Sequence, residues 1–391
     1  MIRRLPIFKS VLQMAGRLVT ENEGGKTMKY ITFAVPCYNS QDYMERCIDS
    51  LVKGGEDVEI LIIDDGSSDN TGAIADRYEV IYPGIVKAVH QENGGHGAGV
   101  NKGLELAQGL YYKVVDSDDW LDADAYESLL TKIKGYYGGN GQEEAGSGEM
   151  RPEGIDEGAC VSEAAPDLFV CNYIYDHLEE GTSRRMHYRN VFPADRICTW
   201  NEINHFHPSQ YLIMHALVYR TEVLRESGIR LPEHTFYVDN LFAYQPLPFV
   251  KSICYMDIDL YHYFLGRDDQ SVNEKVLMRR IDQQIKVTEL VAHCMDLQEV
   301  AENTSPKLAA YMRRNISIMM AISSIHLLLI RSEEAQRKRE LLWKGIKSSN
   351  RRLYYQLKYG TVSGLTCLPG KVGGMVTIGG YRIAKKVYQF Q

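Results

Sequence analysis

The sequence lacks any run of 18 apolar residues free of charge or strong polarity, so we expect no membrane-spanning helix. It also lacks a C-x-x-C pair. Its eight cysteines are scattered over 391 residues and predict reduced thiols rather than a disulfide framework. With 45% hydrophobic and 24% charged residues the composition is that of an average globular protein, which excludes a fibrous or wholly disordered chain.

Basic residues are scarce over most of the chain. The first 330 residues carry 31 bases against 48 acids, a net charge of −17. From Arg331 to the end, 13 bases stand against 3 acids, a net of +10. An acidic body argues against a nucleic-acid partner, because the basic patch of such a protein normally lies on the folded domain. The basic end indicates either contact with an anionic surface or a solvated helical face.

Short apolar runs rich in β-branched residues occur at 30–35, 58–63, 85–89 and 111–115, and segments with helical spacing of apolar residues separate them. This alternation predicts βαβ units and therefore an α/β fold, with a mainly parallel sheet and helices on both faces. In such sheets the ligand lies beyond the carboxyl ends of the strands. The residues that follow each run are therefore the candidates for a functional site.

Polar motifs follow all four runs. They are Pro36-Cys37-Tyr38-Asn39, Asp64-Asp65-Gly66-Ser67, a glycine loop from Gln91 to Gly97, and Asp116-Ser117-Asp118-Asp119. Each motif alone is compatible with turn chemistry or helix capping, but four at one edge of a sheet indicate a site.

The last motif predicts a metal site, because residues two apart in extended backbone point the same way. Asp116 and Asp118 would thus present two carboxylates to one hard cation, leaving positions that Mg²⁺ or Mn²⁺ can share with substrate phosphates. The glycine loop matches neither the G-x-G-x-x-G nor the P-loop spacing, which counts against a dehydrogenase and an ATPase.

In their order and separation these motifs resemble those of family-2 glycosyltransferases of GT-A fold, over about residues 29–270. The resemblance implies inverting transfer of a sugar, hexose or N-acetylhexosamine, from a UDP-sugar donor to a glycan, lipid-linked or other hydroxyl acceptor. It also implies a role in assembling cell-surface glycan or polysaccharide. The Q-x-x-R-W signature of processive polysaccharide synthases is missing, which favours transfer of a single sugar over polymerisation.

The resemblance also implies the residues of the site. Those expected to bind the nucleotide-sugar are Pro36, Asn39, Asp65, Asn93, Gly94, Gly95, Asp116 and Arg267. The metal ligands are Asp116 and Asp118, and the ion is Mn²⁺ or Mg²⁺.

The catalytic base is the Asp of a Glu-Asp pair in most members, and the matching residue here is Asp239, with His234 as the alternative. Val238 replaces the customary Glu. Val100 stands where many members carry Arg, so we expect Lys102 or a downstream cation, with Arg267 as the candidate, to compensate at the phosphates.

We divide the chain into an unassigned N-terminal extension (1–28), a GT-A domain (29–271) with a flexible acidic insertion (138–165), a helical subdomain (272–360) and a basic amphipathic tail (361–391). A helix from Tyr381 to Phe390 would have Tyr381, Ala384, Val387 and Tyr388 on one side and basic residues on the other. Such a tail either contacts a membrane surface weakly or packs on the body. We expect a cytoplasmic protein, with the inner face of the cell membrane as the surface that the tail would contact.

Two other functions stay open. A nucleotidyltransferase shares the α/β sheet and an acidic metal site, but it normally has a basic glycine-rich motif after the first strand, where this chain has Pro36 to Asn39. A non-catalytic module that binds sugar nucleotides or glycans would not need the full acidic set together with Asp239.

Overall fold

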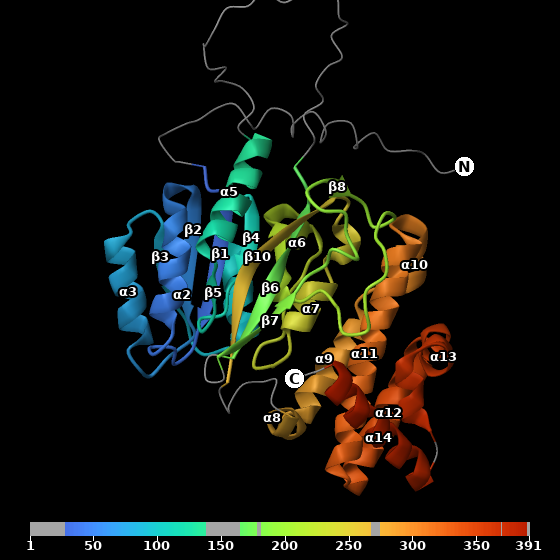
Figure 1. Ribbon diagram of the computed structural model, residues 1–391. Helices are drawn as coiled ribbons and strands as arrows, with labels where there is room; N and C mark the ends of the chain where they lie inside the picture. The colour runs from blue at the N-terminus through green and yellow to red at the C-terminus, as the bar shows by residue number, and fades with distance from the viewer. Residues whose placement is uncertain (1–27, 138–164, 178–180, 267–273, 369, 389–391) are drawn as a thin grey trace, which may run out of the picture.

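The computed structural model describes residues 28–137, 165–177, 181–266, 274–368 and 370–388 (Figure 1). Three predicted features lie outside these ranges: the N-terminal extension except Met28, the acidic insertion except Ala165, and Arg267. The described chain forms a central sheet with helices on both faces and a group of C-terminal helices beside it.

Four parallel strands form the first part of the sheet. They are β1 (Ile31–Cys37), β2 (Val58–Asp64), β3 (Val86–His90) and β4 (Tyr111–Val114), in the order β3-β2-β1-β4. β1 and β2 are buried along their whole length, as is typical of strands covered on both faces. These strands coincide with the four apolar runs of the sequence, which confirms the predicted α/β fold.

The sheet continues beyond β4 in the order β9-β6-β10-β5. The further strands are β5 (Trp120–Leu121), β6 (Leu168–His177), β7 (Thr182–Met186), β8 (Ile197–Cys198), β9 (Leu217–Arg220) and β10 (Ile253–Leu265). β9 runs antiparallel to both β4 and β6, whereas β6 and β10 pair in parallel. This part of the sheet is therefore mixed, and the all-parallel part ends at β4.

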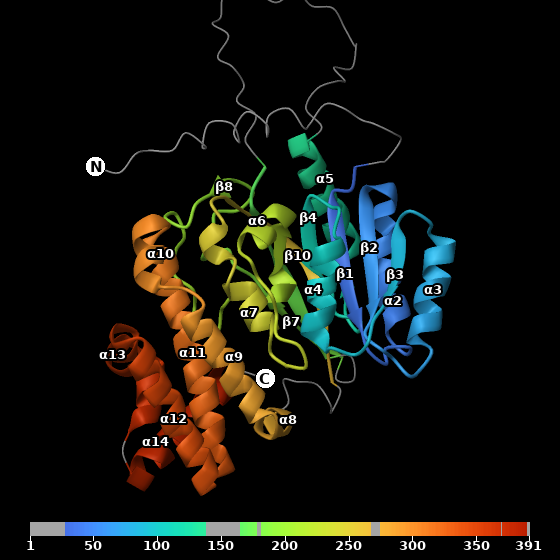
Figure 2. The same cartoon turned by 180° about the vertical axis from the view of Figure 1, so that it is seen from behind.

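Helices cover both faces of the sheet. Figure 1 shows α2 (Met44–Leu51) and α5 (Ala123–Tyr137) in front of it, and Figure 2 shows α4 (His96–Leu106) and α6 (Thr221–Glu226) on the opposite face. α3 (Thr71–Ile81) lies at the β3 edge, and the short α7 (Asp239–Tyr244) lies between the sheet and the C-terminal helices.

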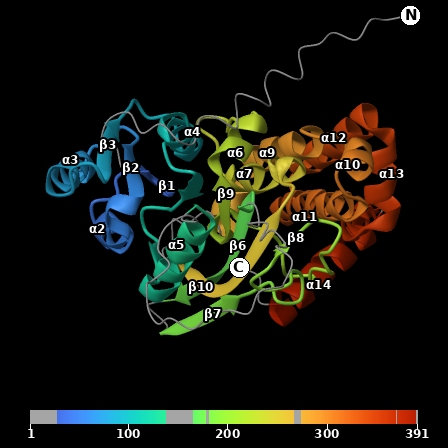
Figure 3. The same cartoon turned by 90° about the horizontal axis from the view of Figure 1, so that it is seen from above.

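The C-terminal helices form a separate group at one side of the sheet (Figures 1 and 3). They are α8 (Glu274–Arg279), α9 (Ile281–His293), α10 (Leu297–Asn303), α11 (Pro306–Ile330), α12 (Glu333–Ser349), α13 (Arg351–Gly360) and α14 (Gly370–Tyr388). α8 and α9 are separate helices, because the backbone leaves the helical conformation at Arg280. None of the helices in the described ranges is both long and apolar enough to cross a membrane.

The predicted tail needs a correction. α14 begins at Gly370, eleven residues before the predicted helix. Its Tyr381 hydroxyl donates to Glu274 Oε2 on α8 at 2.9 Å, and Lys385 Nζ lies 3.3 Å from the same oxygen. Tyr381 therefore faces the neighbouring helices, which agrees with the alternative that the tail packs on the body.

Close packing of α4 on β1 gives a test of the fold. A Cβ at Gly103 would lie 2.6 Å from both the Ala34 Cβ and the Tyr112 hydroxyl, so Gly103→Ala should reduce the free energy of unfolding by about 1–3 kcal/mol. Gly135 on α5 has open space around it, and Gly135→Ala should be neutral or stabilise by about 0.5–1 kcal/mol. Urea midpoints measure both changes, and equal midpoints for the two variants would contradict the packing described.

Candidate active site

Asp65, directly after β2, organises the glycine loop. Its carboxylate is 3% exposed and accepts hydrogen bonds from the backbone N–H groups of Gly94 (2.9 Å) and Gly95 (2.7 Å) and from Gln91 Nε2 (2.7 Å). The Asn93 side chain donates to the Asp65 backbone oxygen at 2.9 Å. The predicted nucleotide residues Asp65, Asn93, Gly94 and Gly95 are thus brought together by one hydrogen-bond network.

The same loop packs against the segment that leads to α7. The backbone N–H of His234 donates to the Gly94 oxygen at 2.6 Å, and the Asn101 side chain both donates to and accepts from the backbone of Leu231. Gly95 has φ 82°, and a Cβ there would lie 3.2 Å from the His234 backbone. Glycine is therefore required at this position both by its left-handed conformation and by the close approach of the backbones.

Asn39 links the loops that follow β1 and β2. Its backbone N–H donates to Ser67 Oγ at 3.0 Å, and its side-chain oxygen accepts from the Ser68 N–H at 2.9 Å. Asn39 has φ 48°, a conformation that Asn tolerates better than most residues. Pro36 is buried at the end of β1 and contacts α4, where Gly99 leaves room for its ring.

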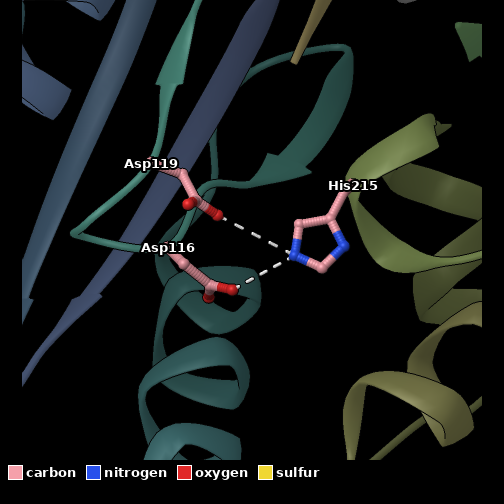
Figure 4. Close-up of side chains that lie close together, drawn as sticks. All are labelled: Asp116, Asp119 and His215. Atoms are coloured by element: carbon pink, nitrogen blue, oxygen red, sulfur yellow. Dashed lines mark hydrogen bonds and ion pairs between the residues drawn. The ribbon is translucent and has the colours of Figure 1, made fainter. Parts of the chain in front are cut away.

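Asp116 lies between two histidines that come from different parts of the chain. Figure 4 shows one of them, His215, beside Asp116 and Asp119. Its Oδ1 is 2.8 Å from Nε2 of His96, the first residue of α4, and its Oδ2 is 3.3 Å from Nε2 of His215, which precedes β9. Burial opposes ionisation of Asp116. The charges and hydrogen bonds of the two histidines outweigh it and hold the pKa of that carboxyl below its usual value.

Asp119 ties the acidic motif to β10. It is fully buried, and its carboxylate accepts from the Tyr261 hydroxyl at 2.6 Å and from the Phe264 N–H at 2.8 Å. The Tyr261 hydroxyl in turn accepts from the Asp116 N–H at 3.1 Å. Burial, together with the charges of Asp118 and Asp116, raises the pKa of Asp119 well above its usual value.

Lys113 on β4 contacts two residues of this cluster, His215 and Tyr261. It is fully buried, and its Nζ donates to the backbone oxygen of His215 at 2.7 Å and lies 4.9 Å from the centre of the Tyr261 ring. Burial lowers the pKa of Lys113 to about 8. The His215 ring packs against Tyr263, with ring centres 4.6 Å apart, so both ends of the histidine are held in place.

The donor set fits a divalent cation. Ligand atoms of Asp116, Asp119 and His215 all lie within 4.8 Å of one another, and carboxylate and imidazole groups suit ions such as Mn²⁺. Both oxygens of Asp119 already accept hydrogen bonds from β10, however, which makes it a poor ligand. The partly exposed Asp118 is the carboxylate of the motif that remains beside Asp116.

Asp239 is the first residue of α7 and belongs to the same electrostatic cluster. Burial raises the pKa of Asp239, against the opposing charges of His215 and His96, and the charge of Asp116 raises it further. The neighbouring Val238 is only 1% exposed and packs into the core. The alternative base, His234, is exposed beside the glycine loop, with φ 48°.

His96, His215 and Tyr261 belong to this site but were not predicted from the sequence. His96 interacts directly with Asp116, whereas Lys102, the expected cation, pairs with Glu105 at 3.2 Å on the outer surface of α4. A histidine directly after a Gly-Gly pair at a helix start was a visible signal for His96. His215 and Tyr261 lie in apolar segments with no motif around them, so no sequence pattern indicated either residue.

Comparisons with known proteins point to one family. A family model described as glycosyl transferase family 2 matches residues 32–142, which begin in β1 and extend past α5. The glycosyltransferase EpsH of Bacillus subtilis is 26% identical over 253 residues, 60% of each chain. The glycosyltransferase GlyA of Streptococcus pneumoniae is 38% identical over 107 residues, 27% of this chain and 15% of GlyA. The chain therefore spans no more than 60% of the length of these two relatives. The family match over residues 32–142 confirms the resemblance of the motifs to this family.

The fold has a solved counterpart. The structure of S. aureus TarS 1–349 in complex with UDP-GlcNAc superposes with a TM-score of 0.60 at 18% identity and covers 93% of this chain and 92% of that one. A second structure of TarS 1–349 gives a TM-score of 0.59. The similarity confirms the predicted GT-A fold.

The Tyr261 hydroxyl can be tested against a matched tyrosine. Tyr261→Phe leaves a buried Asp119 oxygen and the Asp116 N–H without this partner, so the free energy of unfolding should fall by about 1–3 kcal/mol. Tyr244 is equally buried, but its hydroxyl has no hydrogen-bond partner among the described residues, so Tyr244→Phe should be neutral or stabilising. Guanidinium unfolding of both variants makes the comparison. A Tyr261 variant as stable as the Tyr244 variant would show that the bridge contributes nothing.

Proposed function

Because residues 32–142 belong to glycosyl transferase family 2, we propose that the protein is a metal-dependent, inverting glycosyltransferase. It transfers a single sugar from a nucleotide-sugar to a hydroxyl acceptor in the assembly of cell-surface glycan or polysaccharide. The observation that carries the proposal is the convergence of the Asp65 loop network, the Asp116 cluster and Asp239 at one end of the sheet.

The donor is a UDP-sugar in this proposal. TarS, which shares the fold, has been crystallised with UDP-GlcNAc. Pro36, Asn39 and the Asp65 network surround the nucleotide, and the hydrogen bonds within that network fix its shape before the donor arrives. Arg267, outside the described residues, contacts the diphosphate. The acceptor is a glycan, a lipid-linked sugar or another hydroxyl compound.

Asp116 and Asp118 hold the cation, and His215 lies next to Asp116. Held there, Mn²⁺ or Mg²⁺ would supply positive charge to offset the charge that develops on the departing diphosphate, so the leaving group would need no proton. Before the donor binds, His96 and His215 offset the charge of Asp116 and keep its carboxylate ionised. His96, whose Nε2 lies 2.8 Å from Asp116 Oδ1, supplies a cation beside the acidic pair in a chain that has Val100 in place of the arginine.

Asp239 acts as the base. Inversion by direct displacement needs one proton acceptor, which removes the proton of the acceptor hydroxyl as its oxygen attacks the anomeric carbon. A carboxylate whose pKa is raised by burial accepts that proton more readily than an exposed one. The raised pKa of Asp239 therefore supports this role.

Metal-dependent hydrolysis of a donor panel tests the proposal. The purified chain is incubated with UDP-glucose, UDP-galactose and their N-acetyl forms, with Mn²⁺, with Mg²⁺ and with EDTA. A glycosyltransferase should slowly hydrolyse one donor in the presence of metal only. A binding module would bind without hydrolysis. A nucleotidyltransferase would instead form a UDP-sugar from UTP and a sugar phosphate.

Asp239→Asn separates binding from chemistry. The change is nearly isosteric and removes only the proton acceptor, so UDP affinity should persist while transfer falls by about two to four orders of magnitude. Because the pKa of Asp239 is raised, the wild-type kcat/KM should fall with decreasing pH at a pH above the ordinary range of an aspartate, and the variant should lack this limb. Transfer within a few-fold of wild type would move the role of base to His234 or to water.

Asp118→Asn tests the metal assignment. The substitution removes one ligand charge, so turnover should be lost, and UDP binding measured by calorimetry should become weak and insensitive to Mn²⁺. Asp124→Asn, the same substitution at an exposed position on α5, is the matched control and should behave as wild type. An Asp118 variant with unchanged Mn²⁺-dependent UDP binding would exclude this residue as a ligand.

A further inference from the structure

The inner face of α14 is made of small and polar residues. A Cβ at Gly373 would lie 2.6 Å from the backbone of Leu368 in the preceding turn, and a Cβ at Gly374 would lie 3.6 Å from the Leu328 side chain of α11. Thr377 is buried and donates to the Leu365 oxygen at 2.9 Å, and Tyr381 donates to Glu274. These contacts of the inner face are made by glycine, threonine and tyrosine rather than by aliphatic side chains of α14.

The outer face of α14 carries the large apolar side chains instead. Together with the preceding turn η4 (Val362–Cys367) it exposes six of them, each with an exposed fraction of 59–68%: Val362, Leu365, Val372, Met375, Val376 and Ile383. The four on α14 recur at helical spacing and form one stripe, which we call the α14 stripe. A helix of a water-soluble surface normally has the opposite arrangement, and single exposed apolar residues, unlike a stripe, need no explanation.

Basic residues border the stripe. Arg382 and Lys386 are exposed and follow Met375 by 7 and 11 residues, which places them along its edge of the helix. Thr366 and Cys367 of η4 line a groove of about 840 Å³ whose other lining residues include Arg339, Lys344, Lys347 and Arg351 against one acid, Glu340. A groove rich in basic residues therefore borders η4, the turn that also exposes Val362 and Leu365.

We propose that the α14 stripe docks on an anionic lipid surface, with Val372, Met375, Val376 and Ile383 among the upper acyl chains and Arg382 and Lys386 at the lipid phosphates. Large apolar groups beside exposed bases are the composition of a helix that lies in the plane of a membrane interface. A second copy of the chain fits less well, because it would bring another surface of the same positive sign against this one. The proposal goes beyond sugar transfer and does not depend on it.

Co-sedimentation with vesicles tests the surface in the full chain. Phosphatidylcholine vesicles with and without phosphatidylglycerol are compared at low salt. Wild type should sediment with the anionic vesicles, and Val376→Ser with Ile383→Ser should lower the bound fraction at least about five-fold. The matched control is Val80→Ser with Ile81→Ser on α3, whose side chains are 80% and 55% exposed, and it should bind as wild type. Arg382→Gln with Lys386→Gln should weaken the preference for phosphatidylglycerol.

Two outcomes would overturn the proposal. One is equal sedimentation of the stripe variant and wild type. The other is a wild-type dimer, measured by light scattering, that the stripe substitutions convert to monomer without any vesicle binding. Hydrolysis of the UDP-sugar donor without vesicles should be the same in the stripe variant and wild type. A failure of the membrane proposal is thereby distinguished from a failure of the proposed activity, and a folded stripe variant is verified in the same assay.

Discussion

The concentration of carboxylates beyond β4 is the constraint on which the rest of the site depends. Asp116, Asp118 and Asp119 follow one strand, and two of them are stabilised in opposite ways. Asp116 stays ionised because His96 and His215 lie 2.8 and 3.3 Å from its oxygens. Asp119 is buried where ionisation is unfavourable, and hydrogen bonds from β10 satisfy it instead. The three acids of the motif therefore differ in state. Asp116 is ionised between the histidines, Asp119 is buried and hydrogen-bonded to β10, and Asp118 is partly exposed.

The hydrogen bonds of the acidic motif also join parts of the fold that are far apart in the sequence. The partners of Asp119, Tyr261 and Phe264, lie on β10, three positions away from β4 in the sheet. The backbones of Gly95 and His234 meet in the same way and join the α4 loop to the segment before α7. The site is therefore assembled across the point where the sheet changes from parallel to mixed, because its interacting residues come from β10, the α4 loop and the segment before α7 as well as from the β4 end.

The sequence predicted what is local and missed what is not. Apolar runs and the motifs after them are contiguous, so the first four strands and the loop residues from Asp65 to Gly95 could be placed in order. His215 and Tyr261 lie 99 and 145 residues from Asp116, and no pattern announces a contact over that distance. The C-terminal helices show a different failure. Helical spacing identifies an apolar stripe but cannot say whether it faces the protein or the solvent. The sequence therefore left open whether the side with Tyr381 contacts a membrane or the body, and the hydrogen bond to Glu274 shows that Tyr381 faces the body.

The replacement of the customary Glu by Val238 follows from the same charge balance. A glutamate beside Asp239 would add a negative charge to a cluster that already contains Asp116, whereas Val238 is 1% exposed and contributes only to packing. Burial raises the pKa of Asp239, and the positive charges that moderate this increase come from His215 and His96. Those two imidazoles also keep Asp116 ionised, so the same pair of side chains sets the charge of the proposed metal ligand and of the proposed base. In this chain the electrostatic support of Asp239 thus comes from across the site rather than from the neighbouring residue.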